Sequence, residues 1–162
     1  MTGEKILEKQ VLDTWMINHK TNLKLIHELE EDWLDFTTSK RGGGKIGHQL
    51  AHMYNVRYWK LENLDKSLIA DLTTVKAGDE KTKELLIDLH EQSTDFLCSI
   101  FSDAARNDGQ LKKGWKRGLI PLLGYFIHHE AHHRGNILLT LKLSGIKLSN
   151  DLKYGLWEWQ KI

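Results

Sequence analysis

The chain has 162 residues, of which 40% are hydrophobic and 28% are charged, so we expect a single globular domain spanning residues 1–162. Its formal net charge is +1 and no dense basic stripe is present, which gives no reason to expect a nucleic-acid partner. No apolar run approaches the about 18 residues of a membrane span, and residues 1–5 lack the apolar stretch of a signal peptide. We therefore expect a cytoplasmic protein without a membrane partner.

The pattern of apolar residues predicts an all-α fold. The sequence has one proline, little alternation of apolar and polar residues, and long stretches in which apolar residues recur at helical spacing. A break is expected at residues 41–44, where three glycines follow Arg41. The predicted helices, in chain order, span about residues 5–31, 45–63, 79–107 and 118–144.

Four long helices in a chain of this length predict a four-helix bundle. Bundles of this kind build metal sites in their core from side chains on facing helices. The aromatic tail, residues 154–159, is expected to pack across one end of the domain. The six tryptophans are expected in the core or at the end of the bundle, and Trp59 is the best placed of them to line a pocket.

The most informative segment lies in the fourth predicted helix, where four of the nine histidines occur within six residues. Histidines four positions apart share one helix face, so both His129/His133 and His128/His132 could bind one metal ion together. A helical wheel separates these pairs. His129 and His133 lie roughly 100° from the mean apolar direction, at the border of the buried face, while the other pair lies roughly 160° away and points to solvent. We therefore expect His129 and His133 to be metal ligands.

The second predicted helix carries another pair with this spacing, His48 and His52. One imidazole from this helix and two from the fourth would form a three-histidine site with an open position, as in catalytic metal centres. Both histidines lie on the polar side of their helix. His52 forms an i, i+4, i+7 stripe with Val56 and Trp59, which favours it over His48, but the residues alone leave this ligand open.

Glu130 and Arg134 also lie four positions apart and point toward the apolar face of the fourth helix, so we expect an ion pair between them in the core or at a subunit interface. Residues 129–133 further satisfy H-E-x-x-H, the zinc metallopeptidase pattern in which the glutamate is the general base. No strand that could hold an extended peptide is predicted upstream. A metallopeptidase is therefore an alternative interpretation, and it is the less favoured one.

Residues 124–145, which include His-Glu-Ala-His-His-Arg-Gly-Asn-Ile at 129–137, resemble the last-helix signature of the DinB/YfiT-like superfamily. Residues 46–52, followed by Arg-Tyr-Trp at 57–59, resemble its second-helix signature. The resemblance implies an up-down-down-up four-helix bundle, often a homodimer. It also implies a divalent metal, zinc or nickel, on three histidines, which by position are His52, His129 and His133. Asn136 departs from the pattern, because glutamine usually follows Arg-Gly there.

Characterised members of this superfamily include transferases and isomerases that use low-molecular-weight thiols such as bacillithiol or mycothiol. Because a metal-coordinated thiol is deprotonated, the resemblance implies a metal-dependent S-transferase that acts on a small-molecule substrate. No catalytic side chain besides the ligands is predicted. The alternative is a non-enzymatic, stress-induced bundle with a structural metal. In that case a fourth ligand, His48 or His132, would close the site.

Overall fold

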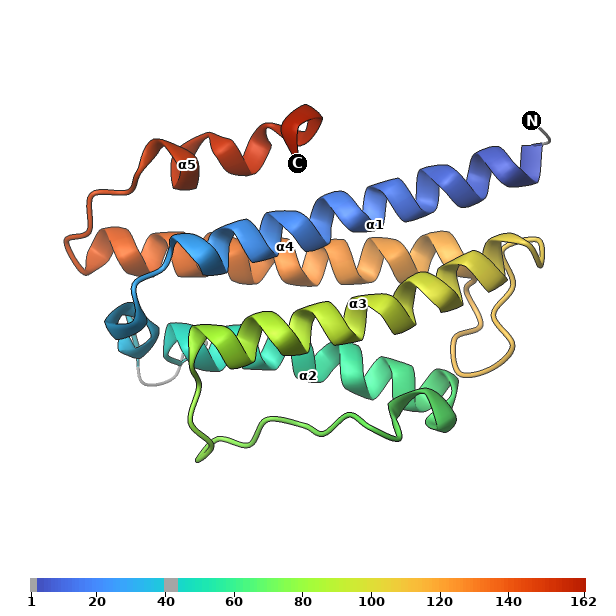
Figure 1. Ribbon diagram of the computed structural model, residues 1–162, viewed down its shortest axis with the longest axis horizontal. Coiled ribbons are helices and arrows are strands. Elements are labelled where there is room, and N and C mark those ends of the chain that lie inside the picture. Colours follow the sequence, from blue (N-terminus) through green and yellow to red (C-terminus); the bar gives the residue numbers. More distant parts are fainter. Residues whose placement is uncertain (1–2, 40–43) are drawn as a thin grey trace.

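The computed structural model of the chain describes residues 3–39 and 44–162 (Figure 1). Its four long helices are α1 (Gly3–Glu28), α2 (Ile46–Leu64), α3 (Lys83–Ala105) and α4 (Leu119–Leu143). The short helices are η1 (Glu31–Asp35), η2 (Lys66–Ile69), α5 (Asn150–Lys153), η3 (Gly155–Trp157) and η4 (Trp159–Lys161). No strand occurs in the part of the chain that is described, so the all-α prediction is confirmed.

The bounds of the long helices follow from local signals that spacing alone does not give. α3 begins at Lys83, four residues later than predicted, because the Thr82 side chain caps it and accepts a hydrogen bond from the Leu85 amide at 3.2 Å. α1 ends at Glu28 and the chain continues into the 3₁₀ helix η1. Residues 41–43 of the predicted glycine break lie outside the described residues.

The core of the bundle consists of two apolar clusters separated by a polar layer. The first cluster surrounds Trp15, Phe101 and Phe126, and the second gathers residues such as Leu25 and Leu50. All four long helices contribute to both clusters. Between them, the helices bring together polar side chains with little or no exposure: Asn18, Asn22, Arg57, His90, Ser93, Thr94 and Glu130. This layer needs internal partners, because an unpaired buried polar group is costly.

The segments that follow α2 and α4 both turn back along the bundle. Figure 1 shows the connection 65–82 returning along α2 before α3 begins, and the C-terminal tail lying beside α1. The tail is anchored by buried Leu152 and Leu156 and by an ion pair between Asp151 and Lys24 at 2.9 Å. Trp157 and Trp159 remain exposed. The tail therefore lies alongside α1 rather than across one end, and the expectation that these tryptophans are covered is wrong.

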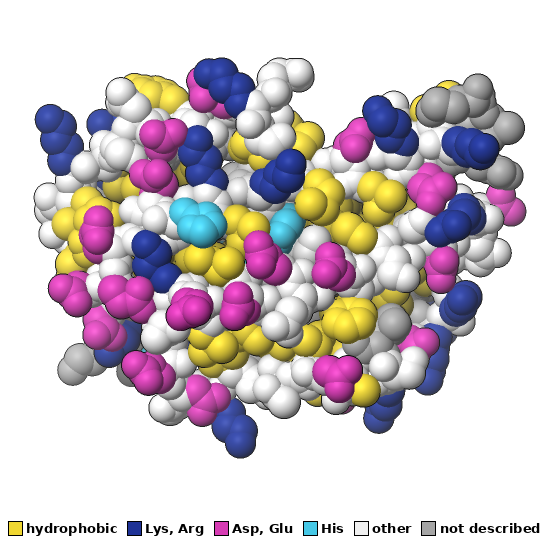
Figure 2. Space-filling model, viewed as in Figure 1, with side chains coloured by type: hydrophobic (Ala, Val, Ile, Leu, Met, Phe, Trp, Pro, Cys, Tyr) yellow, Lys and Arg dark blue, Asp and Glu magenta, His cyan; other side chains and the backbone are white. Residues whose placement is uncertain are grey.

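Charged side chains cover much of the visible face of the molecule. Figure 2 shows acidic side chains gathered across its middle, and α3 carries exposed Glu84, Asp88, Glu91 and Asp95. Basic side chains are scattered and form no continuous stripe on this face. None of the described helices is long and apolar enough to cross a membrane.

Candidate metal centre

Three histidines from two facing helices meet at the surface of the bundle: His52 from α2, and His129 and His133 from α4. One ring nitrogen of each lies within 4.8 Å of those of the other two, and Nε2 of His52 is 3.2 Å from Nε2 of His129. Two nitrogens that bind one tetrahedral zinc at about 2.0–2.1 Å lie about 3.3 Å apart. The cluster therefore fits a single divalent ion, and an all-imidazole donor set suits zinc or nickel.

The burial of the three histidines increases from one side of the cluster to the other. His52 is exposed, His129 is partly exposed and His133 is buried. The cluster is thus supported from the α4 side and open to solvent at His52. This order agrees with the wheel analysis of the fourth helix, because His128 and His132, predicted to point to solvent, are exposed.

The two histidines considered as a fourth ligand lie outside the cluster. His48 lines a separate polar cavity together with Asp35 and Lys81. His132 is exposed, and its Nε2 lies 3.0 Å from the Asn136 side-chain amide. The structure therefore brings His52, and not His48, to the pair on α4. Among the described residues, no further His, Cys, Asp or Glu joins the trio as a fourth ligand.

The imidazoles of the cluster are held in the neutral form. Burial lowers the pKa of His52, and burial together with the neighbouring His52 lowers the pKa of His129. Burial, with His129 and His52 nearby, lowers the pKa of His133 to about 4. Only a neutral imidazole can bind a metal, so the environment of all three rings favours the metal-binding form at neutral pH.

Gln49, three residues before His52 on α2, orients the most buried ring. Its side-chain oxygen lies 3.4 Å from Nδ1 of His133. An imidazole that donates from Nδ1 keeps a free lone pair on Nε2, which is the usual arrangement of a metal-binding histidine. The sequence analysis missed this residue. The signal that could have revealed it is a polar side chain one helical turn from His52, on the side of α2 that faces α4.

Glu130 points away from the cluster into the polar layer, where its partner is Arg57 from α2. Arg57 donates from Nε to Oε1 at 2.6 Å and from Nη2 to Oε2 at 3.0 Å, and Asn18 and Asn22 each donate to Oε2 at 2.6 Å. Burial alone would raise the pKa of Glu130, but the charge and hydrogen bonds of Arg57 outweigh it and lower the pKa to about 2.

The predicted ion pair between Glu130 and Arg134 is therefore wrong. Arg134 instead donates to the side-chain oxygens of Asn18 and Asn22, at 2.9 and 2.5 Å, and these two amides donate in turn to Glu130. The wheel gave the correct face for both charges. It could not identify Arg57, because a partner on another helix depends on how the helices pack.

The environment of Glu130 also decides against the metallopeptidase interpretation. A general base must reach a metal-bound water at the open side of the site. The Glu130 carboxylate has no solvent exposure and is occupied by Arg57, which further donates to the His90 carbonyl at 3.0 Å and to Thr94 Oγ1 at 3.1 Å. Glu130 therefore joins α1, α2 and α4 structurally, and Arg57 extends the network to α3.

A comparison with protein-family models finds that the DinB family matches residues 2–157, which include all four long helices and most of the tail. The chain belongs to the DinB family. No curated protein and no solved structure matches it.

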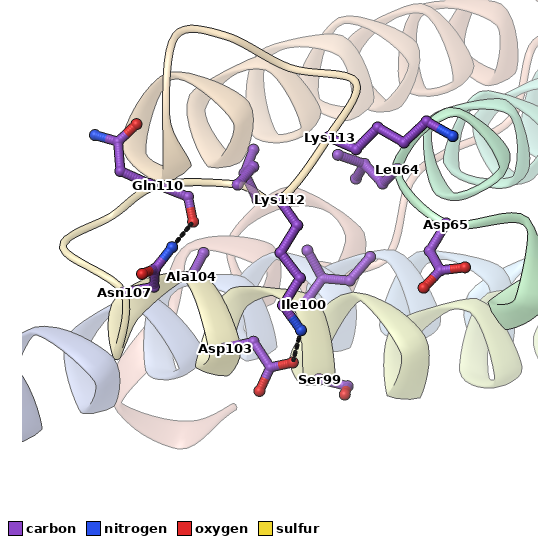
Figure 3. Close-up of a pocket in the computed structure, with 11 residues that line it drawn as sticks. Leu64, Asp65, Ser99, Ile100, Asp103, Ala104, Asn107, Gln110, Lys112 and Lys113 are labelled. Carbon is purple, nitrogen blue, oxygen red and sulfur yellow. Dashed lines mark hydrogen bonds and ion pairs between the residues drawn. The ribbon is translucent and has the colours of Figure 1, made fainter.

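A separate cavity of this DinB-family protein, with a volume of about 110 Å³, lies at the C-terminal end of α3 (Figure 3). Lys112 and Lys113 line it, and Lys112 pairs with Asp103 at 3.7 Å. Asn107 closes the adjoining turn by donating to the Gln110 carbonyl at 3.2 Å. The lining contains no histidine, so this cavity is distinct from the metal centre.

Proposed function

We propose that this DinB-family protein binds one divalent metal, zinc or nickel, through His52, His129 and His133, and that it transfers a low-molecular-weight thiol to a small electrophilic substrate. The observation that carries the proposal is the convergence of three neutral imidazoles within 4.8 Å at a site that is open on the His52 side. A site with three protein ligands leaves a position for an exogenous ligand, whereas a structural zinc site is normally closed by four.

A bound divalent ion would supply one piece of chemistry, the deprotonation of a coordinated thiol to its nucleophilic thiolate. The chain itself would perform the remaining tasks. The imidazoles hold the ion, Gln49 fixes the tautomer of His133, and the buried pair of Arg57 and Glu130 holds α2 against α4 so that the ligands stay together. The Trp59 ring, 6.4 Å from the His52 ring, would shield one side of the bound thiol.

The first test is the metal content of protein purified without an affinity tag. We expect about one zinc or nickel per chain in the wild type and none in the His129→Ala/His133→Ala variant, measured by elemental analysis. The His128→Ala/His132→Ala variant is the matched control, since it removes two histidines of the same spacing from the exposed face of the same helix. This control should retain the metal.

The second test is activity. Metal-loaded protein is incubated with bacillithiol, mycothiol or glutathione and a model electrophile, and the thioether product is measured by mass spectrometry. Turnover that disappears with His129→Ala/His133→Ala supports the transferase. Metal binding without turnover of any thiol would favour the alternative of a structural metal in a non-enzymatic bundle. Wild-type protein that binds neither zinc nor nickel after incubation would contradict the transferase and favour a non-enzymatic bundle in which the metal is absent.

The proposal extends to the architecture. We propose that residues 1–162 form one domain with up-down-down-up helix order, supported by the connection 65–82 running back along α2 (Figure 1). We also propose a homodimer, as the family resemblance implies. Light scattering coupled to size-exclusion chromatography would give about twice the 18.8 kDa chain mass if the homodimer forms.

A further inference from the structure

Next to the histidine cluster, the facing sides of α2 and α4 carry aromatic residues and one lysine. On α2, Trp59 and Lys60 follow His52 by about two turns, and on α4, Tyr125 precedes His129 by one turn. The Tyr125 ring is nearly parallel to the His129 ring, at 6°, with centroids 6.0 Å apart. Trp115, from the loop before α4, has its ring centroid 5.7 Å from that of Tyr125. We call Tyr125 and Trp115 the aromatic wall.

Lys60 lies against this wall without a negative partner. Its Nζ is 4.6 Å from the centroid of Tyr125 and 4.9 Å from that of Trp115. Two aromatic faces attract the ammonium and fix its position, but they do not neutralise its charge or accept conventional hydrogen bonds from all three of its N–H groups. Among the described residues, Lys60 has neither an ion-pair partner nor a hydrogen-bond acceptor. Its charge is therefore available to a ligand.

Lys60 also lines a small cavity. The cavity has a volume of about 50 Å³, and its other lining residues include Asn63, Trp115 and Leu122. A cavity that holds one water needs a volume of roughly 10–15 Å³, so this cavity can accept a group the size of a carboxylate. A single fixed positive charge matches a single negative one, which favours a carboxylate over a doubly charged phosphate.

We infer that Lys60 is the anion-binding residue of the site and that the ligand bound at the histidine cluster is a small molecule carrying a carboxylate. Tyr125 contacts both His129 and Lys60, so one aromatic ring separates the two binding points. A thiol with a carboxylate a few bonds from its sulfur would lie over this ring, with the sulfur at the cluster and the carboxylate at Lys60. The inference rests on the proposed function for the sulfur end, while the anion site itself does not require a metal.

The anion site is tested first in metal-free protein. 3-Phenylpropionate and its neutral counterpart 3-phenylpropanol are titrated while tryptophan fluorescence is followed. We expect the carboxylate to bind about tenfold more tightly than the alcohol, the size of effect that one charge-assisted hydrogen bond provides. Lys60→Met should abolish this preference and Lys60→Arg should retain most of it. Lys142→Met, which removes an exposed lysine at the far end of α4, is the control and should match the wild type.

The connection to the cluster is tested in nickel-loaded protein with 3-mercaptopropionate and 2-mercaptoethanol, using the thiolate-to-nickel absorption band to obtain dissociation constants. We expect the carboxylate thiol to bind about tenfold more tightly, and Lys60→Met to remove this difference without weakening 2-mercaptoethanol. The absorption band reports binding and needs no turnover.

The two experiments separate the possible failures. If neither nickel nor zinc binds, the proposed function fails and the metal-free titration alone decides whether Lys60 binds a carboxylate. If Lys60→Met keeps the wild-type preference in both experiments, the inference is wrong although the metal site stands. A carboxylate preference in metal-free protein that is absent from the nickel-bound thiols would also overturn it, because the anion site would then not serve the ligand at the cluster.

Discussion

Arg57 and Glu130 form an ion pair with no solvent exposure between α2 and α4, the same two helices that supply the three histidines. Arg57 lies five residues after His52, and Glu130 lies between His129 and His133 in the chain. The pair and its amide partners therefore hold the helices together directly behind the candidate metal centre.

Glu130→Ala should destabilise the protein by about 3–5 kcal/mol, because it leaves the Arg57 guanidinium buried without its counter-charge. The free energy of unfolding is measured by urea denaturation. Glu158→Ala, which breaks the exposed pair with Lys161, is the control and should unfold like the wild type. The metallopeptidase interpretation would be supported instead if the wild type has a peptidase activity and the Glu130→Ala protein loses it while remaining as stable as the wild type.

His52→Ala should lose the metal, whereas His48→Ala should retain it. The two residues share a helix and are one turn apart, but only His52 lies within reach of His129, with their Nε2 atoms 3.2 Å apart. Zinc affinity is measured by competition with a chromophoric chelator. Equal loss of affinity in both variants would mean that His48 is a ligand and that the site is closed.

Gln49→Ala should weaken metal binding by about tenfold without abolishing it, since it removes only the acceptor near Nδ1 of His133. Gln49→Glu should preserve or strengthen binding, because a carboxylate accepts the same hydrogen bond and makes the imidazole a better donor to the metal. The same chelator competition measures both. If Gln49→Ala binds zinc as tightly as the wild type, the contact does not orient His133.

The protein should lose stability as the pH falls below about 6.5. Burial, followed by the charge of Arg57, lowers the pKa of His90 to about 3 and that of His19 to about 4, while both would titrate near 6.5 in the unfolded chain. At a pH below about 6.5 but above the folded-state pKa values, the unfolded chain binds protons at these histidines that the folded protein does not. The contribution to stability is therefore complete above about pH 6.5 and declines as the pH falls below it. Glu130 contributes only at lower pH, below about 4.5.

His90→Gln tests this assignment. The amide can still donate to the Leu50 carbonyl, which His90 Nε2 approaches at 3.1 Å, but it does not titrate. The free energy of unfolding is measured by urea denaturation between pH 6 and 4.5. Its slope against pH should correspond to the uptake of about one proton fewer on unfolding in the variant than in the wild type. Identical slopes would show that protonation of His90 does not contribute.

The sequence predicted those features that depend on spacing within one helix. The all-α class, the approximate extents of the four helices and the position of His129 and His133 toward the buried side of α4 follow from periodicity along the chain. The buried residues of α4 recur at helical spacing and occupy one face of the helix, so its wheel was informative. On α2 the wheel failed, because this helix contacts α3, α4, η1 and η2 and its buried residues surround most of its circumference.

Features that depend on the packing between helices were not predictable in this way. The choice of His52 over His48 came from family resemblance, and the structure supports it by placing His52 opposite α4. The partnership of Glu130 with Arg57, and the approach of Gln49 to His133, join residues 73 and 84 positions apart. Spacing can mark Gln49 as a polar neighbour of His52, but a single sequence does not show which residue on another helix each side chain contacts, because these contacts are set only when the helices pack.

The position of the cluster has a consequence for the stability of the chain. With one cysteine, this protein has no means of covalently cross-linking itself, yet His52 and His129 are 77 positions apart and would both bind the same ion. A metal at this point would close a large loop in the folded protein. By analogy with a disulfide across a loop of that length, the restriction is worth at most about 4.5 kcal/mol. Chelation would therefore release a tether between the second and last helices, and the free energy of unfolding would fall with the loss of the metal.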